Sequence, residues 1–115
     1  MGQWVKGKSH DTYGPIGPYL VTTDEITNTN NLNLTLDVNG KRMQTGNTNK
    51  MIFNVNFIVS YLSNYMSLQS GDIITTGTPP GVGMGMKPQV FLKNGDKLKL
   101  SIDKLGEQNS KVVLE

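Results

Sequence analysis

One stretch of strict alternation, followed at once by a turn dipeptide, constrains the fold more than any other feature of the chain. Apolar and polar side chains alternate through residues 32–38, and Asn39-Gly40 comes next. A period of two predicts a strand with one apolar face and one wet face, and Asn-Gly suits the two positive-φ positions of a type I′ turn. The sequence therefore predicts an antiparallel hairpin that returns through residues 41–46. The alternating apolar residues are Leu32, Leu34, Leu36 and Val38.

The remainder of the chain is predicted to be mainly β with one short helix. It has no alanine, while Asn, Thr and Gly are abundant, and this composition disfavours long helices. Helical spacing spans residues 55–66 behind Asn54 as an N-cap, which predicts about three turns packed on a sheet. Further strands are predicted at residues 73–76, 97–102 and 111–114.

Two pentapeptides echo each other. The sequence Leu-Gln-Ser-Gly-Asp at 68–72 is matched by Leu-Lys-Asn-Gly-Asp at 92–96, and each precedes a predicted strand. We expect two similar turns. Two copies do not make a repeat architecture, which needs at least three units.

Length and composition narrow the class of protein. The 115 residues make one small domain, 1–115, and they include no cysteine and a single histidine, His10. Disulfides, thiolate metal sites and a zinc site of several imidazoles are thereby excluded. A formal charge of +2 gives no basic patch for nucleic acid, and no apolar run approaches the length of a membrane span. We expect a cytoplasmic protein with neither nucleic acid nor membrane as partner.

Polar side chains that could carry chemistry gather at residues 8–12, which we call the N-terminal cluster. Lys8, Thr12 and Asp11 could bind an anionic substrate or a hydrated metal ion, but the same residues also suit a polar turn. A triad of Ser9, His10 and Asp11 is not expected, because neighbours along an extended chain point to opposite faces.

Two Gly/Pro-rich stretches resist assignment to helix or strand. The Pro segment covers residues 14–18, and the Gly/Pro loop covers residues 77–86. The loop lacks the Gly-Lys-Ser/Thr ending of a nucleotide-binding loop. Its prolines remove N–H donors, so it is better suited to form a wall around a small ligand than a phosphate site.

Three motifs in order along the chain resemble the fumarylacetoacetate hydrolase family. The resemblance implies a mixed β-sandwich or β-roll fold, Mg²⁺ or Mn²⁺, and cleavage or isomerisation of small oxo acids. Within the family, the sequence is most similar to the branch of 2,4-diketo-acid hydrolases, ureidoglycolate lyases and hydroxyheptadienedioate isomerases. The motifs are residues 7–22, residues 39–53 with Gln44 and Gly46-Asn47-Thr48, and residues 71–83.

The resemblance also implies site residues. Lys8 matches a lysine beside the metal and the substrate carboxylate, Thr12 a position beside the metal, and Thr76 a threonine that contacts substrate. Gly77 and Thr78, which follow Thr76, are likewise expected to bind substrate or to lie beside the metal. A lysine ammonium does not ligate a cation, so Lys8 is expected to act on the substrate's negative charge. No confident catalytic residue is identified.

The family's metal ligands are not matched here. A Glu-x-Glu pair, a later Asp and a His/Glu dyad lie upstream of the lysine that Lys8 matches, and no Glu-x-Glu occurs in this sequence. We expect no metal site in this chain, with Asp11 as the one candidate ligand. The chain then corresponds to the C-terminal portion of a catalytic domain: a truncated gene, an excised segment, or a subunit that needs a partner.

Two functions of different class follow. The first is a metal-dependent hydrolase of 2,4-diketo acids, of the acylpyruvate type, for which this chain supplies the substrate-facing half. An isomerase or a lyase of the same family is an alternative to the hydrolase. The second is a non-catalytic β domain. In either case we expect a homodimer, or association with a missing N-terminal half, because an incomplete sheet exposes apolar strand faces.

Overall fold

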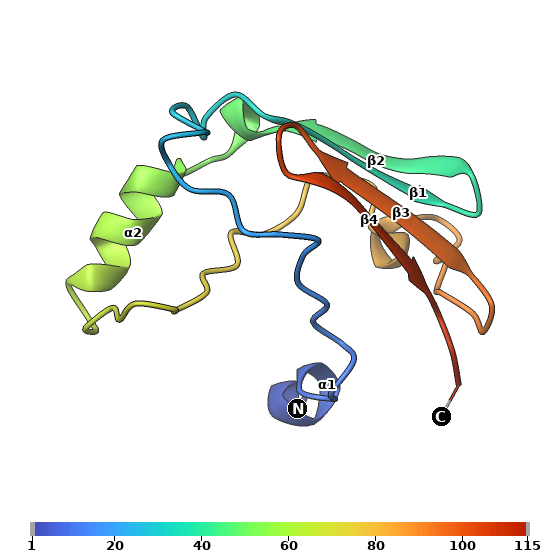
Figure 1. Cartoon of the computed structure of the whole chain (residues 1–115). Coiled ribbons are helices and arrows are strands. Elements are labelled where there is room, and N and C mark those ends of the chain that lie inside the picture. The colour runs from blue at the N-terminus through green and yellow to red at the C-terminus, as the bar shows by residue number, and fades with distance from the viewer. Residues whose placement is uncertain (1, 115) are drawn as a thin grey trace.

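The computed structural model describes residues 2–114 and is built around one antiparallel sheet (Figure 1). The strand order is β2-β1-β3-β4. The strands are β1 (Asn33–Val38), β2 (Lys41–Asn47), β3 (Lys97–Ile102) and β4 (Gly106–Lys111). The helices are α1 (Trp4–Lys8) and α2 (Val55–Ser63), with 3₁₀ turns at Thr48–Lys50 and Gly83–Gly85. The mainly β prediction is confirmed.

The predicted hairpin is present, and its turn also anchors the next strand. Asn39 and Gly40 have φ values of 52° and 78°, as a type I′ turn requires. The Asn39 side chain donates to Asp96 Oδ1 at 2.9 Å and accepts from the Lys97 backbone N–H at 2.9 Å. One turn residue therefore joins the β1–β2 hairpin to the start of β3.

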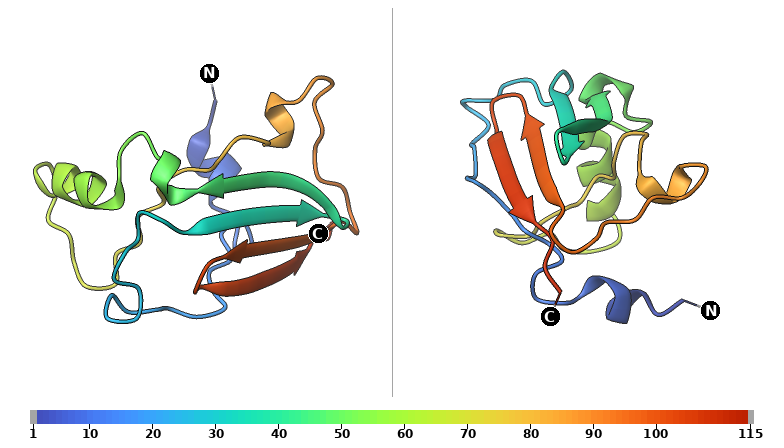
Figure 2. Two further views of the ribbon diagram at one scale, coloured as in Figure 1. Left: turned by 90° about the horizontal axis from the view of Figure 1, so that it is seen from above. Right: turned by 90° about the vertical axis from the view of Figure 1, so that its right-hand side faces the viewer.

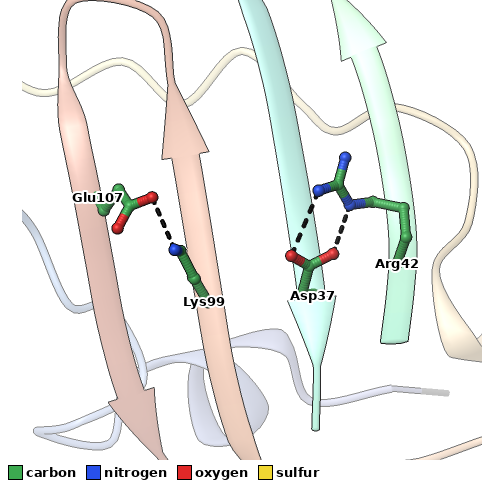
Figure 3. Close-up of polar contacts among 4 residues, drawn as sticks. All are labelled: Asp37, Arg42, Lys99 and Glu107. Carbon is green, nitrogen blue, oxygen red and sulfur yellow. Dashed lines mark hydrogen bonds and ion pairs between the residues drawn. The ribbon is translucent and has the colours of Figure 1, made fainter. Parts of the chain in front are cut away.

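One face of the sheet carries paired charges. Asp37 on β1 faces Arg42 on β2, and Lys99 on β3 pairs with Glu107 on β4 at 2.8 Å (Figure 3). The hydrogen bond from Arg42 holds the pKa of Asp37 below its usual value. All four groups are solvent-accessible, so each pair adds little stability. This is the wet face that the alternation predicts.

Asp96 gives the fold a dependence on pH. Its carboxylate accepts hydrogen bonds from Asn39 Nδ2 and, at 2.7 Å, from the Lys93 N–H, and these lower its pKa. A depressed folded-state pKa stabilises the fold above the unfolded value of about 3.9. That stability is lost as the pH falls through the folded-state pKa.

We expect the melting temperature of the chain to fall as the pH is lowered from about 5 to about 2. Thermal melts of the wild type and of Asp96→Asn across this range measure the effect. The variant should show a shallower fall, because it has no proton to take up at this position. An equally steep fall would assign the dependence to other carboxylates such as Asp37.

A bulge in β2 changes which side chains face the apolar side of the sheet. The pairing runs Val38–Lys41 and Asp37–Arg42, but Leu36 then pairs with Gln44, so Met43 is the extra residue. A regular two-residue hairpin would place Gln44 opposite Thr35, on the wet face. Because a bulge shifts the register by one residue, Gln44 lies on the apolar face.

The predicted helix forms, but it does not pack on the sheet. Asn54 caps α2 by accepting from the Phe57 N–H at 2.8 Å, as predicted. The predicted packing is wrong: α2 lies to one side of the sheet (Figure 1), and extensive contacts between elements join strands alone. A row of aromatic rings, stacked except for the tilted last pair, runs along its exposed side, and we call it the aromatic ladder. Its members are Phe53, Phe57, Tyr61 and Tyr65.

The two echoing pentapeptides form the same turn. The Asp72 carboxylate accepts from the Gln69 N–H at 2.8 Å, as that of Asp96 does from Lys93, and Gly71 and Gly95 have φ values of 95° and 90°. However, the predicted strand at 73–76 is absent. Its β-branched residues favour extended backbone, but within residues 2–114 no strand lies beside it to complete a ladder.

The predicted last strand is displaced. β4 occupies Gly106–Lys111 rather than residues 111–114. Lys104 and Gly106, with φ values of 63° and 79°, form the turn, and the chain pairs with β3 directly after it. Residues 107–110 are all polar, so their sequence shows no apolar alternation, yet an edge strand is stabilised by its ladder hydrogen bonds.

The chain exposes much more surface than a self-contained domain of its mass. Ile26 and Leu32, at 6% and 7% exposure, are the buried apolar side chains of residues 2–114. The accessible surface is 9677 Å², against about 6,200 Å² expected for a compact chain of this size. The radius of gyration is 15.7 Å, against about 13 Å. In the described residues no helix is long and apolar enough to cross a membrane.

Candidate functional site

The Gly/Pro loop and the residues that follow it lie against the apolar face of the sheet beside β1 and β2. Together they enclose a hollow of about 210 Å³. Figure 2 shows this stretch of chain running alongside β2. The lining residues are Leu36, Val38, Met43, Gln44, Gly81, Val82, Gly83, Val90, Phe91, Leu92, Asp96 and Leu98.

Gln44 attaches the loop to the sheet. Its Nε2 donates to Thr78 Oγ1 at 2.8 Å and to the Pro79 carbonyl at 2.6 Å, which uses both N–H groups of the amide. At 8% exposure, Gln44 is the buried polar side chain of the described residues. Beside it, a Cβ at Gly46 would come within 2.8 Å of Pro79 Cβ, so glycine there lets the loop approach.

Gln108 holds the Pro segment in the same way on the opposite edge of the sheet. Its Nε2 donates to the Pro15 carbonyl at 3.2 Å and to the Gly17 carbonyl at 3.1 Å. Nearby, the Tyr19 hydroxyl occupies the space above Gly106, where a Cβ would overlap it. The Pro segment is thus attached to β4, and the Gly/Pro loop is attached to β2.

Three of the predicted site residues lie in or beside this loop. Thr76, Gly77 and Thr78 are exposed, and Gly77 has a φ of 96° that favours glycine. Thr78 accepts the hydrogen bond from Gln44 described above. Its hydroxyl proton is therefore free to donate to another oxygen, because an accepted bond uses a lone pair and not the proton.

The N-terminal cluster lies apart from the loop. Lys8 ends α1, which lies at the bottom of Figure 1, away from the sheet. Both Lys8 and Thr12 are exposed. Among the described residues, the hydrogen bonds join neither of them to Thr76, Gly77 or Thr78. That all five residues form one site therefore stays a prediction.

An open hollow of about 420 Å³ borders this cluster, lined by Val5, Lys6, Ser9, His10 and Asp11. His10 packs on the Tyr13 ring, with ring centroids 4.7 Å apart, and the Tyr13 N–H donates to the His10 carbonyl at 3.0 Å. The cluster thus contains a local turn. Asp11 lines the hollow as its one carboxylate.

The described residues do not by themselves fit a divalent metal ion. Mg²⁺ and Mn²⁺ prefer several oxygen ligands, whereas residues 2–114 contain no group of three or more His, Cys, Asp or Glu side chains close enough to share an ion. Asp11, the candidate ligand, lies beside Ser9 and His10 and has no second carboxylate in the hollow.

Sequence reasoning assigned no role to either glutamine. Gln44 was noted as part of a motif, and the bulge at Met43 that turns it toward the loop has no signature in the sequence. Gln108 lies in a run of polar residues that predicts no strand. Gln44 lies opposite Leu36 and Gln108 lies opposite Leu100, so each is a polar residue paired with an apolar one. This signal can be recognised only once the strand pairing is known.

Comparisons with known proteins agree with the fold and the motifs. The family model described as fumarylacetoacetate hydrolase C-terminal matches residues 1–113. The 2,4-didehydro-3-deoxy-L-rhamnonate hydrolase of a Sphingomonas species is 57% identical over 96% of this chain and 39% of its own length. This chain thus spans about two fifths of the length of such relatives.

Solved structures give the same result. Fumarylacetoacetate hydrolase from Exiguobacterium antarcticum superimposes with a TM-score of 0.92 at 40% identity, over 96% of this chain and 39% of that one. Maleylpyruvate hydrolase from Sphingobium, solved with manganese(II) and pyruvate, gives 0.82 at 36% identity, over 90% of this chain and 37% of that one. With its fold and its three motifs matched along nearly the whole sequence, this chain belongs to the fumarylacetoacetate hydrolase family.

Proposed function

We propose that this chain supplies the substrate-facing wall of a hydrolase that cleaves a carbon–carbon bond in small 2,4-dioxo acids. The observation that carries the proposal is the 57% identity, over nearly the whole chain, to the Sphingomonas hydrolase. The name of that enzyme's substrate describes an acid oxidised at carbons 2 and 4, which is a 2,4-dioxo acid. An isomerase reaction is the alternative, supported by the 38% identity to a 2-hydroxyhepta-2,4-diene-1,7-dioate isomerase from Mycobacterium marinum. A lyase reaction stays a prediction of the sequence alone.

The donors of this chain suit such a substrate. In the hydrolysis, water adds to the C4 carbonyl carbon, the C3–C4 bond breaks and C3 takes up a proton, which leaves a 2-oxo acid and a carboxylic acid. Negative charge develops on the oxo groups during these steps. The Thr76 and Thr78 hydroxyls and the Gly77 N–H belong to one short exposed stretch and are hydrogen-bond donors of the kind that stabilise such oxygens. The Lys8 ammonium would attract the substrate carboxylate.

A divalent metal ion would polarise the oxo groups of the substrate when bound. The Sphingobium relative is solved with manganese, which supports Mg²⁺ or Mn²⁺ use in the family. The described residues of this chain do not form such a site. We therefore assign this chain the binding and orientation of substrate and no metal-dependent step.

A binding experiment tests the proposal. Pyruvate, the 2-oxo acid that acylpyruvate cleavage releases, is titrated into the ¹⁵N-labelled chain while amide resonances are followed. We expect saturable shifts at Thr76, Gly77 and Thr78 and an affinity at least tenfold lower in Thr76→Val. Propionate, which has the carboxylate and lacks the oxo group, is the control ligand. The proposal is wrong if pyruvate and propionate shift the same resonances equally.

A turnover assay tests whether the isolated chain can use an added metal ion for catalysis. We expect the 115-residue chain to leave the ultraviolet absorbance of acylpyruvates unchanged with Mg²⁺ or Mn²⁺, because its described residues gather no metal ligands. Absorbance loss that a chelator abolishes would contradict this and assign the ligands to this chain. Asp11→Asn would then be the first variant to make.

A further inference from the structure

We infer that Gln44 and Gln108 are a matched pair of positioning residues, which hold the Gly/Pro loop and the Pro segment on the apolar face of the sheet. The inference rests on the proposed function, because the Gly/Pro loop directly follows Thr76 and contains Gly77 and Thr78, and the Pro segment begins two residues after Thr12.

Both glutamines stand in one cross-strand row. Gln44 pairs with Leu36, Leu36 with Leu100, and Leu100 with Gln108. Directly opposed residues point to the same side of a sheet, so both amides lie on the apolar face. Three strand spacings separate them, which is about 14 Å. The row therefore has an amide at each edge strand and two leucines between them.

Both amides are used in the same manner. Each donates both N–H groups of Nε2 to one segment, Gln44 to Thr78 and Pro79, and Gln108 to Pro15 and Gly17. Three of the four acceptors are backbone carbonyls in Gly/Pro-rich sequence, where no regular ladder satisfies them. The amides thus replace secondary structure as the link between segments and sheet.

The hydrogen bond from Gln44 to Thr78 also leaves the Thr78 hydroxyl as a donor for a ligand. Because Gln44 donates to Thr78 Oγ1, the threonine keeps its own proton for an outside acceptor. A substrate oxygen is such an acceptor. Removing the Gln44 amide would free the loop and would also let the Thr78 hydroxyl turn toward the Pro79 carbonyl that the amide leaves unpaired.

Methionine substitutions test the two attachments separately. Gln44→Met and Gln108→Met keep side-chain length and remove the donors. In ¹⁵N relaxation measurements we expect lower backbone order parameters at Thr78, Gly81 and Val82 in Gln44→Met. In Gln108→Met we expect the same change at Ile16 and Gly17, with β1 unchanged in both. Gln89→Met is the matched control, because Gln89 donates only to Met84 in its own loop.

A second variant distinguishes positioning from simple packing. Gln44→Glu keeps the shape but, when ionised, offers the Pro79 carbonyl no donor, and burial raises the pKa of the introduced carboxyl. We expect the Gly/Pro loop resonances to be displaced at pH 7, where the carboxylate is ionised, and to move back toward wild-type positions as the pH is lowered and the carboxyl regains a proton. Loop resonances that match the wild type at pH 7 would overturn the inference for Gln44.

The pyruvate titration tests whether Gln44 and Gln108 affect substrate binding. We expect Gln44→Met and Gln108→Met each to weaken pyruvate binding about tenfold, with Gln89→Met unchanged. Wild-type order parameters at both segments in the two variants would overturn the inference, whatever pyruvate does. If the loops loosen as expected but the wild type binds no pyruvate, the positioning role stands and the proposed function fails.

Discussion

Gly83→Ala is expected to push the Gly/Pro loop away from the chain at Val90. A Cβ at Gly83 would overlap the Val90 carbonyl oxygen, and backbone cannot move aside as a flexible side chain does. The Val90 N–H also donates to the Gly83 carbonyl at 3.0 Å, so Gly83 and Val90 cannot separate without losing this bond. Overpacking of this kind costs about 1–3 kcal/mol, and the broken hydrogen bond adds about 1 kcal/mol.

The measurement is amide exchange at Val90 and the melting temperature, with Gly85→Ala as control. Gly85 lies in the same 3₁₀ turn, has a negative φ, and its nearest neighbour to an added Cβ is Val82 Cγ2 at 3.6 Å, an ordinary contact. We expect the control to behave as wild type. Equal melting temperatures for the two variants would show that the loop does not have this close packing in solution.

Self-association of the isolated chain is the second large effect expected. The structure exposes about 3,500 Å² more surface than a compact chain of its mass would, and a standard protein–protein interface buries about 1,600 Å² in all. The aromatic ladder on α2 is one such surface, since Phe57 and Tyr61 are 49% and 51% exposed. The segment 51–71 around it carries no charged residue, so nothing there opposes association.

Sedimentation velocity over a range of concentrations measures this association. We expect a dimer or larger species for the wild type and a smaller one for the double variant Phe57→Glu with Tyr61→Glu. The control double variant Asn56→Glu with Ser60→Glu adds the same charge about 100° around the helix and should associate as the wild type does. A sharp, concentration-independent monomer for the wild type would contradict the prediction.

Local sequence determined the elements whose causes are local. The hairpin at Asn39-Gly40 and the cap at Asn54 were predicted because turn and cap preferences act over two to four residues. The echoing pentapeptides form the same aspartate-closed turn for this reason too. The motifs at residues 7–22, 39–53 and 71–83 likewise indicated the family before any fold was known.

Elements that depend on distant partners were not determined in this way. Residues 73–76 have strand-forming side chains but no neighbouring strand, whereas polar residues 107–110 form a strand because β3 lies beside them. The helix α2 has an apolar face, and yet the sheet does not cover it. Pairing and packing are set by the whole chain, so alternation and periodicity alone could not decide them.

The candidate site likewise combines features of local sequence with features that depend on distant parts of the chain. The available residue types can be read from the sequence: the lysine and hydroxyls at 8–12, the threonines at 76–78, and two Gly/Pro stretches too irregular for a sheet. How those stretches are held depends on the folded sheet, because a one-residue bulge at Met43 turns Gln44 from the wet face to the apolar face. A register shift is a property of two paired strands, and neither strand's sequence specifies it alone.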